Sequence, residues 1–423
     1  MVTGLSLLQN SIFLKGKIKE KSSVAYFILI FTNCWFDAIM KKYVAMDYFN
    51  ETYEQSRNAF LEKAVSVMER YPKAVREEIT VTDQTDSPLT TDILYIPSEE
   101  GSETLVVVTS GVHGIEAFTG SALQLLFLDE FLLEPKARKQ KTAFLFVHSV
   151  NPFGHKYYRR VDGNNVDINR NFDTSETLFL RENAAYASFH SLLNPEAPYR
   201  RKTAEKMRFL LKALKILRKK DVKTFRQAVL QGQYAFEKGI FFGGKRFAPQ
   251  KEIMEQITCR YAERHRRIIL IDLHTGYGYR GRLHLIGMDE YPDPEILKQL
   301  RQLYPGEKIE VANKDSGDFY KISGSMFDFI YKVCSAKNKT VLPVAWEFGT
   351  FDNIKTRKSL ESLRIMISEN QGFHYGYANE KSRKKALDEF RNLYYPDDPK
   401  WRAMVLDKGR KVFGKLLTQV TNV

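Results

Sequence analysis

Four long apolar runs, separated by helical sequence, limit what this chain can fold into. The runs are TLVVVTSG (104–111), TAFLFVHSV (142–150), RIILIDLH (267–274) and TVLPVAWEFG (340–349). Strands that are apolar along their whole length are buried on both faces, which is typical of parallel sheets covered by helices. We therefore predict an α/β fold built on a doubly covered, mostly parallel mixed sheet.

Shorter elements complete this prediction. Extended segments are expected at 93–97 and 282–287, and helices at 52–70 and 120–132. Residues 174–240 are helical in pattern, basic and polar-faced, and we predict that they form an insertion on one side of the sheet. Residues 46–423 are expected to form a single domain that carries this insertion.

Residues 1–45 differ in pattern from the rest of the chain. A basic stretch precedes VAYFILIFTNCWFDAIM (24–40), which is apolar but interrupted by Asn33 and Asp37. A spanning helix needs about 20 predominantly apolar residues, and no clear cleavage site of a signal peptide is present. The segment can be a weak anchor, an appended helix or upstream sequence before a working start at Met46. The last is favoured, because MDYFNETYEQSRNAFLEKA opens like a domain helix.

The cysteine content and the net charge indicate the cellular compartment of the protein and the kinds of partner that it binds. Cys34, Cys259 and Cys334 are odd in number and lack C-x-x-C spacing, which argues against a disulfide framework and for a reducing compartment. The net charge is +14, but the basic residues fall in local runs typical of solvated helix faces, without an RNA-binding signature. We expect a cytoplasmic protein with no specific nucleic-acid partner, attached to a membrane only if residues 24–40 act as an anchor.

Residues capable of metal chemistry follow the predicted strands. His113 and Glu116 come after the first run, His274 ends the third, and Glu347 lies near the end of the fourth. The carboxyl ends of parallel strands share one edge of a sheet, where functional groups gather. Two histidines and one carboxylate are a set that catalytic zinc uses. The alternatives are a core or capping role for His274 and a purely structural role for the neighbouring Asp272.

A hydrolytic zinc site also needs a base for the attacking water and a cation for the developing oxyanion. Glu347 is placed to be the base, although a strand-end glutamate can equally form an ion pair. A loop between the second and third runs supplies Arg159, Arg160, Asn169 and Arg170. Arginine presents a bidentate fork to a carboxylate, which suits a substrate with a free C-terminus. The alternative is a basic surface loop.

Taken in order, these motifs resemble the zinc carboxypeptidase family, of which carboxypeptidase A is a member, and in particular an uncharacterised bacterial branch of it. The resembling motifs are HGIE, NPFG, RR followed by VDINRN, QGQYAFEKGIFFGG, DLHTGYG, DFYKISGSMFDF and EFGT. The resemblance covers residues 46 to about 375, and the shared order of the motifs is more specific than any one of them. The resemblance implies the α/β/α fold of that family.

The resemblance also implies a cofactor and a base. His113, Glu116 and His274 would bind one zinc ion, and Glu347 would act as general base and then as general acid.

Further roles follow for the loop between the second and third runs and for a later segment. Arg159 would polarise the scissile carbonyl, with Arg160 as its close rival beside the substrate. Asn169 and Arg170 would grip the terminal carboxylate of the substrate. Tyr320 would match a mobile tyrosine that closes over the substrate.

The resemblance therefore implies a zinc metallocarboxypeptidase-like hydrolase that cuts an amide or peptide bond next to a free carboxylate. The EFGT ending is also similar to N-acyl amino acid deacylases of the aspartoacylase and succinylglutamate desuccinylase type, which would act on N-acyl amino acids. The segment 174–240 is expected to border the cleft. A non-catalytic basic binding protein is the remaining alternative, and no G-x-S-x-G motif supports a serine hydrolase.

Overall fold

The computed structural model describes residues 48–81, 88–99, 101–133, 142–219, 222–288, 291, 293–311 and 322–421. The chain divides into two units, residues 1–45 and 46–423, and every described residue belongs to the second. The predictions for residues 1–45, including an anchor at 24–40, therefore lie outside the described residues. The same holds for Tyr320.

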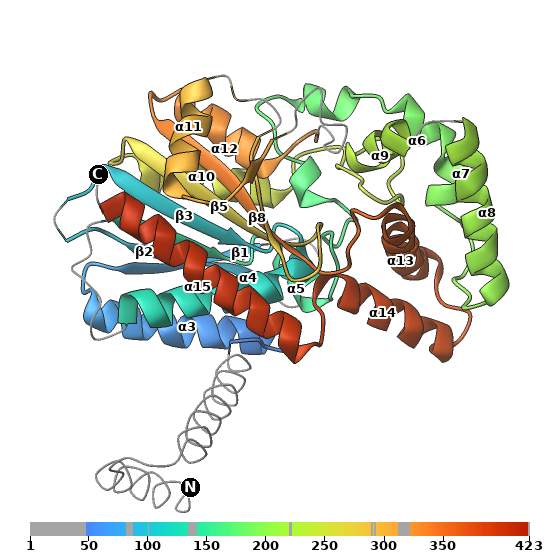
Figure 1. The fold of residues 1–423 in the computed structure, drawn as a ribbon, viewed down its shortest axis with the longest axis horizontal. Coiled ribbons are helices and arrows are strands. Elements are labelled where there is room, and N and C mark those ends of the chain that lie inside the picture. Colours follow the sequence, from blue (N-terminus) through green and yellow to red (C-terminus); the bar gives the residue numbers. More distant parts are fainter. Residues whose placement is uncertain are drawn as a thin grey trace, which may run out of the picture. The chain divides into compact units, whose positions relative to one another are not determined.

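A mixed sheet organises the described residues (Figure 1). Its strands are β1 (Val75–Val81), β2 (Leu89–Ile96), β3 (Thr104–Ser110), β4 (Ala143–His148), β5 (Arg267–Gly276), β6 (Leu283–Ile286), β7 (Ile309–Glu310) and β8 (Thr340–Gly349). They lie in the order β1-β2-β4-β3-β5-β8-β6-β7. The central strands β4, β3, β5 and β8 are mutually parallel, whereas β2 and β6 pair antiparallel with them. The predicted fold class is confirmed.

Burial on both faces explains why the central strands are apolar along their length. All seven residues of β3 and all six of β4 are buried. Valine and isoleucine dominate β3 and β5, and these branched side chains suit a buried pleated surface. The carboxyl ends of the four parallel strands meet at one edge of the sheet, so the segments that follow them lie close together.

Helices cover both faces of this sheet (Figure 1). On one face, α3 (Tyr53–Arg70), α4 (Ala117–Phe127) and α15 (Pro399–Thr421) pack together, and Phe127 of α4 lies against Phe413 of α15. On the other face, α10 (Pro249–Ala262) and α12 (Met326–Ser335) pack onto the strands in one apolar cluster. The helix α11 (Pro294–Leu303) contacts α15.

Further elements join these layers. They are η1 (Gly114–Glu116), η2 (Leu128–Leu133), α5 (Pro152–Lys156), η3 (Ile168–Arg170) and α14 (Glu380–Tyr394). Within the part of the chain that the structure describes, no helix is both long enough and apolar enough to cross a bilayer.

The segment 174–240 forms a group of helices at one side of the sheet (Figure 1). Its elements are η4 (Glu176–Leu180), α6 (Ala184–Ser188), α7 (His190–Leu193), α8 (Thr203–Lys219) and α9 (Val222–Leu230). The helices α6, α7, α8 and α9 share an apolar cluster with α13 (Thr356–Tyr375), and its members include Phe189, Phe225, Leu363 and Ile367. This cluster is separate from the one beneath α10 and α12, so the segment has a small core of its own.

The buried His148 on β4 makes stability dependent on pH. Its ring is fully buried, stacks on Phe60 and contacts Ser121. Burial, with the nearby charge of Arg57, lowers the pKa of His148 to about 3, against about 6.5 in an unfolded chain. Below pH ~6.5 the unfolded state binds a proton that the folded state excludes, so folding free energy is lost as the pH falls towards 3.

We expect the His148→Gln variant to lose less stability than the parent over that window, by up to about 1.4 kcal/mol per pH unit. At neutral pH the variant should be modestly less stable, because the contact with Ser121 changes. Urea unfolding of both proteins between neutral and mildly acidic pH measures the difference. Equal slopes against pH would show that His148 does not carry the effect.

Candidate active site

A glycine-containing turn after β3 places two of the predicted ligands. His113 precedes η1 and Glu116 ends it, so both side chains leave one tight turn. The N–H of Gly114 donates to the carbonyl of Arg160 (3.1 Å). A Cβ added at Gly114 would lie 2.2 Å from the backbone of Gly154, so only glycine lets the turn dock this closely on α5.

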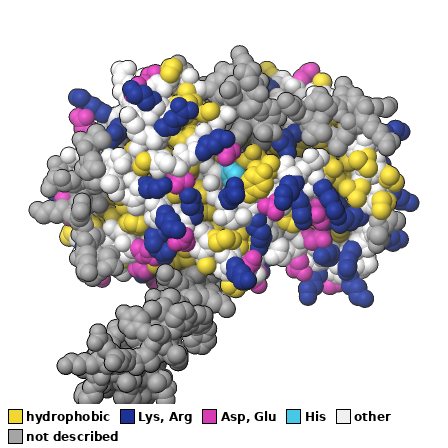
Figure 2. All heavy atoms as spheres, viewed as in Figure 1, with side chains coloured by type: hydrophobic (Ala, Val, Ile, Leu, Met, Phe, Trp, Pro, Cys, Tyr) yellow, Lys and Arg dark blue, Asp and Glu magenta, His cyan; other side chains and the backbone are white. Residues whose placement is uncertain are grey.

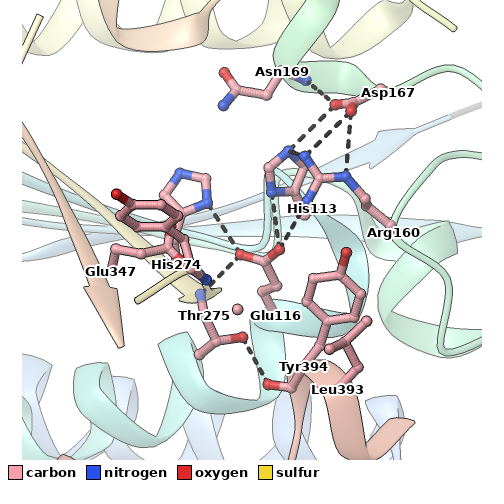
Figure 3. A network of polar contacts seen from close by, with 12 residues as sticks. His113, Glu116, Arg160, Asp167, Asn169, His274, Thr275, Glu347, Leu393 and Tyr394 are labelled. Carbon is pink, nitrogen blue, oxygen red and sulfur yellow. Dashed lines mark hydrogen bonds and ion pairs between the residues drawn. The ribbon is translucent and has the colours of Figure 1, made fainter. Parts of the chain in front are cut away.

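His113, Glu116 and His274 come together as a compact buried group (Figure 3). Nδ1 of His113 lies 3.0 Å from one carboxylate oxygen of Glu116, and Nδ1 of His274 lies 3.1 Å from the other. One ligand atom from each residue lies within 4.8 Å of the others, so the three could hold a metal ion. Two strand ends far apart in sequence thus supply one donor set, β3 through the turn and β5 directly.

A second layer of polar groups orients these donors. Nε2 of His274 contacts Asp272 at 2.6 Å, and Nε2 of His113 lies 3.3 Å from Asp167. The N–H of Thr275 donates to Glu116 (2.9 Å). A carboxylate on the outer nitrogen fixes a histidine ring with its inner nitrogen turned towards a metal. Burial alone would raise the pKa of Glu116, but the two histidines lower it well below its usual range, which keeps the carboxylate ionised.

Glu347 lies beside this group on the neighbouring strand. Its position on β8 pairs with that of His274 on β5, and its carboxylate accepts a hydrogen bond from the N–H of Tyr277 (2.8 Å). Burial and the charge of Glu116 raise the pKa of Glu347 to about 8. A cation held by Glu116 would offset that repulsion and lower the pKa of Glu347 again. The side chain lines the same pocket as the three possible ligands.

Arg160 is the arginine that the structure places beside the possible ligands (Figure 3). Its guanidinium lies 3.2 Å from Glu116, 3.3 Å from Asp167 and 2.6 Å from Nε2 of His113. Burial alone would raise the pKa of Asp167, but the charge of Arg160 lowers it well below its usual range. Arg160 lines the pocket and is therefore in position to meet a substrate.

Arg159 lies elsewhere. Its guanidinium forms an ion pair with Glu369 (2.8 Å) and stacks over the ring of Phe373 (3.5 Å to the centroid). It is buried, and it is not among the described residues that line the pocket. The contacts of Arg159 therefore join the loop to α13.

Asn169 and Arg170 both line the pocket from η3. The side-chain oxygen of Asn169 accepts from the N–H of Met326 (2.9 Å) at the start of α12. Arg170 donates through Nε and Nη2 to the carbonyl of Leu230, at the end of α9, and through Nη1 to the carbonyl of Asn169. Both residues are thus rigidly held, and Arg170 is held by the segment 174–240.

Two residues of the site were not predicted. Asp167, inside the VDINRN motif, is buried and contacts both His113 and Arg160. Its position two residues before Asn169 in a motif of site residues was an available signal. Tyr394 lines the pocket near Arg160 and comes from α14, far along the chain, where no sequence pattern marked it.

The pocket above these groups has a volume of about 190 Å³. Its polar floor is the ligand group with Glu347, and its walls are largely apolar. The walls come from four helices, with Phe225 and Val229 on α9, Leu363 on α13, Phe327 on α12 and Tyr394 on α14. The segment 174–240 therefore borders the pocket, and it also contributes Arg226 to the lining.

The fold and the site define an α/β protein with a candidate metal centre at the carboxyl edge of its sheet. The chain belongs to the family described as "Protein of unknown function (DUF2817)", whose sequence model matches residues 49–408. No curated protein matches the chain.

Solved structures similar to this chain include metallocarboxypeptidases and an aspartoacylase family protein. Carboxypeptidase A from Helicoverpa armigera is 11% identical, with a TM-score of 0.39 over 77% of this chain and 71% of that chain. A metallo-carboxypeptidase from Burkholderia cenocepacia is 12% identical, with a TM-score of 0.40 over 86% and 71%. An aspartoacylase family protein from Mesorhizobium loti is 12% identical, with a TM-score of 0.34 over 72% and 67%. These likenesses are distant.

Proposed function

We propose that this protein is a zinc-dependent hydrolase that cleaves an amide or peptide bond adjacent to a free carboxylate. The observation that carries the proposal is the convergence of three possible metal ligands with Glu347 and Arg160 in one buried pocket. A protein that only binds nucleic acid or another partner would not need a buried glutamate such as Glu347 beside three possible metal ligands.

The donor set fits zinc. Two imidazole nitrogens and a carboxylate are typical ligands of catalytic zinc, and they leave a coordination position free for water. Nδ1 of His113 is buried and lies 3.0 Å from the carboxylate of Glu116, but without the angles of a good hydrogen bond. A buried nitrogen left without a partner is costly, and a metal ion would satisfy it. Asp167 and Asp272 support the two rings from outside, as carboxylates commonly do at zinc sites.

Glu347 and Arg160 would have different roles in the hydrolysis. When bound, zinc would lower the pKa of a water molecule and polarise the substrate carbonyl. Glu347, held by the N–H of Tyr277, would accept the proton of the attacking water and pass it to the leaving amine. Arg160 carries a permanent charge in the same pocket and would stabilise the negative charge that develops on the carbonyl oxygen.

Asn169 and Arg170 would bind the free carboxylate of the substrate. In Arg170, Nη1 and Nη2 each donate one hydrogen bond to a backbone carbonyl, so each retains a second N–H. A guanidinium fixed in this way offers a preorganised pair of donors to a carboxylate. We propose this role for the pair because both side chains line the pocket beside the metal ligands.

An N-acyl amino acid is the second candidate substrate. The observation that favours it is the enclosure of the pocket by α9 and α13, at a volume of about 190 Å³, which is small for an extended peptide. A panel of peptides with free C-termini and N-acetyl or N-succinyl amino acids separates the two. Cleavage of the acylated amino acids alone would identify a deacylase, and cleavage of the peptides a carboxypeptidase.

Metal analysis tests the proposed site. We expect purified protein reconstituted with zinc to retain about one equivalent through dialysis, and the His113→Ala variant to retain almost none. Chelation should lower the melting temperature of the parent, because metal that binds only the folded state stabilises it, by about 4 kcal/mol at a thousandfold excess over Kd. The variant should not respond to the chelator.

His190→Ala is the matched control, because His190 lies on α7 in the inserted segment and away from the metal ligands. It should keep zinc and the response to chelation. Equal zinc retention by the parent and the His113→Ala variant would contradict the assignment.

A further inference from the structure

We propose that the outer face of α8, together with the basic groove beside it, binds the surface of an anionic membrane. This inference goes beyond the hydrolase and does not depend on it. The binding surface is defined by the apolar residues Met207, Leu211 and Leu214 and by the basic residues Arg208, Lys212 and Lys215.

An apolar stripe runs along the exposed face of α8. Met207, Leu211 and Leu214 are spaced i, i+4 and i+7, which puts them on one side of a helix. They are 53%, 59% and 49% exposed. The core-facing side of α8 uses other residues, Phe209 and Ala213 among them, to pack into the cluster of the inserted segment. The exposed stripe therefore does not serve the internal packing of the segment.

A basic stripe lies beside the apolar one. Arg208, Lys212 and Lys215 repeat the same spacing one residue further along, so each basic side chain leaves the helix next to an apolar one. All three are exposed. Of the basic side chains described on α8, only Lys206 forms an ion pair, with Glu361 at 3.6 Å. The charge of the basic stripe is thus directed outward.

A groove next to α8 extends this positive charge. The groove has a volume of about 810 Å³ and runs between α8, α13 and α14. Among its described lining residues, eight are lysine or arginine and two are glutamate, and Arg208 and Lys212 belong both to the groove and to the basic stripe. Arg200 and Arg201 line it from the loop before α8. Figure 2 shows hydrophobic and basic side chains next to one another on the side of the molecule where Figure 1 places α8.

The apolar stripe and the basic stripe lie side by side on α8, and this combination indicates what binds there. A helix with leucine on one side and lysine or arginine on the other lies in a membrane interface, with its apolar side chains among the acyl chains and its charges at the phosphates. Nucleic acid would meet the charges but would leave Met207, Leu211 and Leu214 exposed. A second copy of this chain would bring the same positive charges together. An anionic bilayer satisfies both stripes at once, and the groove gives its phosphate groups a recess.

Vesicle flotation tests the proposal with the full-length protein. We expect the parent to float with vesicles of phosphatidylcholine that contain phosphatidylglycerol, less at high salt, and not with vesicles of phosphatidylcholine alone. Reversal of the basic stripe (Arg208→Glu, Lys212→Glu, Lys215→Glu) should weaken partitioning at least about 100-fold, since each such charge contributes roughly fivefold. Serine in place of Met207, Leu211 and Leu214 should weaken it at least about tenfold.

The matched control reverses three exposed lysines on other elements, Lys73, Lys298 and Lys411. It has the same net charge as the reversed basic stripe and should partition far more strongly. Circular dichroism and melting temperature establish that each variant is folded. Equal weakening in the control and the stripe variant would reduce the effect to net charge and overturn the proposal. Absence of flotation, with self-association in sedimentation velocity that the serine variant loses, would identify a second copy as the occupant and also overturn it.

Discussion

Replacement of Glu347 by glutamine is expected to remove hydrolysis while leaving the bound metal in place. The amide keeps the size of the side chain and can still accept from the N–H of Tyr277, but it cannot take a proton from water. Loss of a positioned general base lowers kcat by roughly 10²–10⁴-fold. Steady-state kinetics on the best substrate of the panel, combined with metal analysis of the same preparation, measures both halves of this expectation.

Glu369→Gln is the control for this experiment. Glu369 is a buried glutamate as well, but it pairs with Arg159 outside the pocket. The control should lose stability and keep its kcat. If Glu347→Gln retained full activity with zinc bound, Glu347 could not be the general base, whatever the substrate.

The second large effect separates the two neighbouring arginines. Arg160→Ala should lower kcat/KM by about 10²–10³-fold, the usual loss when one stabilising donor is removed from an oxyanion, and it should also lower the melting temperature, because the buried Asp167 loses the guanidinium that offsets its burial. Arg159→Ala should lower stability without a comparable loss of activity. It leaves Glu369 as an unpaired buried charge, which costs about 3–5 kcal/mol of folding free energy, while activity per folded molecule stays within a few-fold.

Kinetics and urea unfolding on both variants give the comparison. The double variant Arg159→Met with Glu369→Met removes the whole buried pair and should recover much of the stability lost in Arg159→Ala. A fall in kcat in a stable Arg159 variant would return the catalytic role to Arg159.

The identity of the pocket arginine illustrates what the sequence could not resolve. Arg159 and Arg160 are adjacent, and no periodicity distinguishes them in a loop. The direction of each is set by the backbone, which is left-handed at Tyr158 (φ 54°) and whose carbonyl at Arg160 accepts a hydrogen bond from the N–H of Gly114. These contacts join segments more than 40 residues apart, which is beyond the reach of a local pattern.

The central sheet could be predicted, because a strand that is buried on both faces is apolar along its whole length. The edge strands carry a weaker signal. β1 reads VREEITV and has no buried residue, since it lies at the edge of the sheet beside β2 and keeps charges towards water. β7 has two residues. The possible ligands at the strand ends could be located from the central strands, whereas Tyr394 lies in the pocket because of how α14 packs.

The bond between Arg170 and the carbonyl of Leu230 has a consequence for how this chain can be altered. Arg170 also lies against the backbone of Gly232, where an added Cβ would come within 2.7 Å of its side chain. A shortened chain without residues 174–240 would lose both supports and one wall of the pocket. The helices of residues 174–240 are therefore not a detachable module, and a graft of another segment would have to present a carbonyl at the same point.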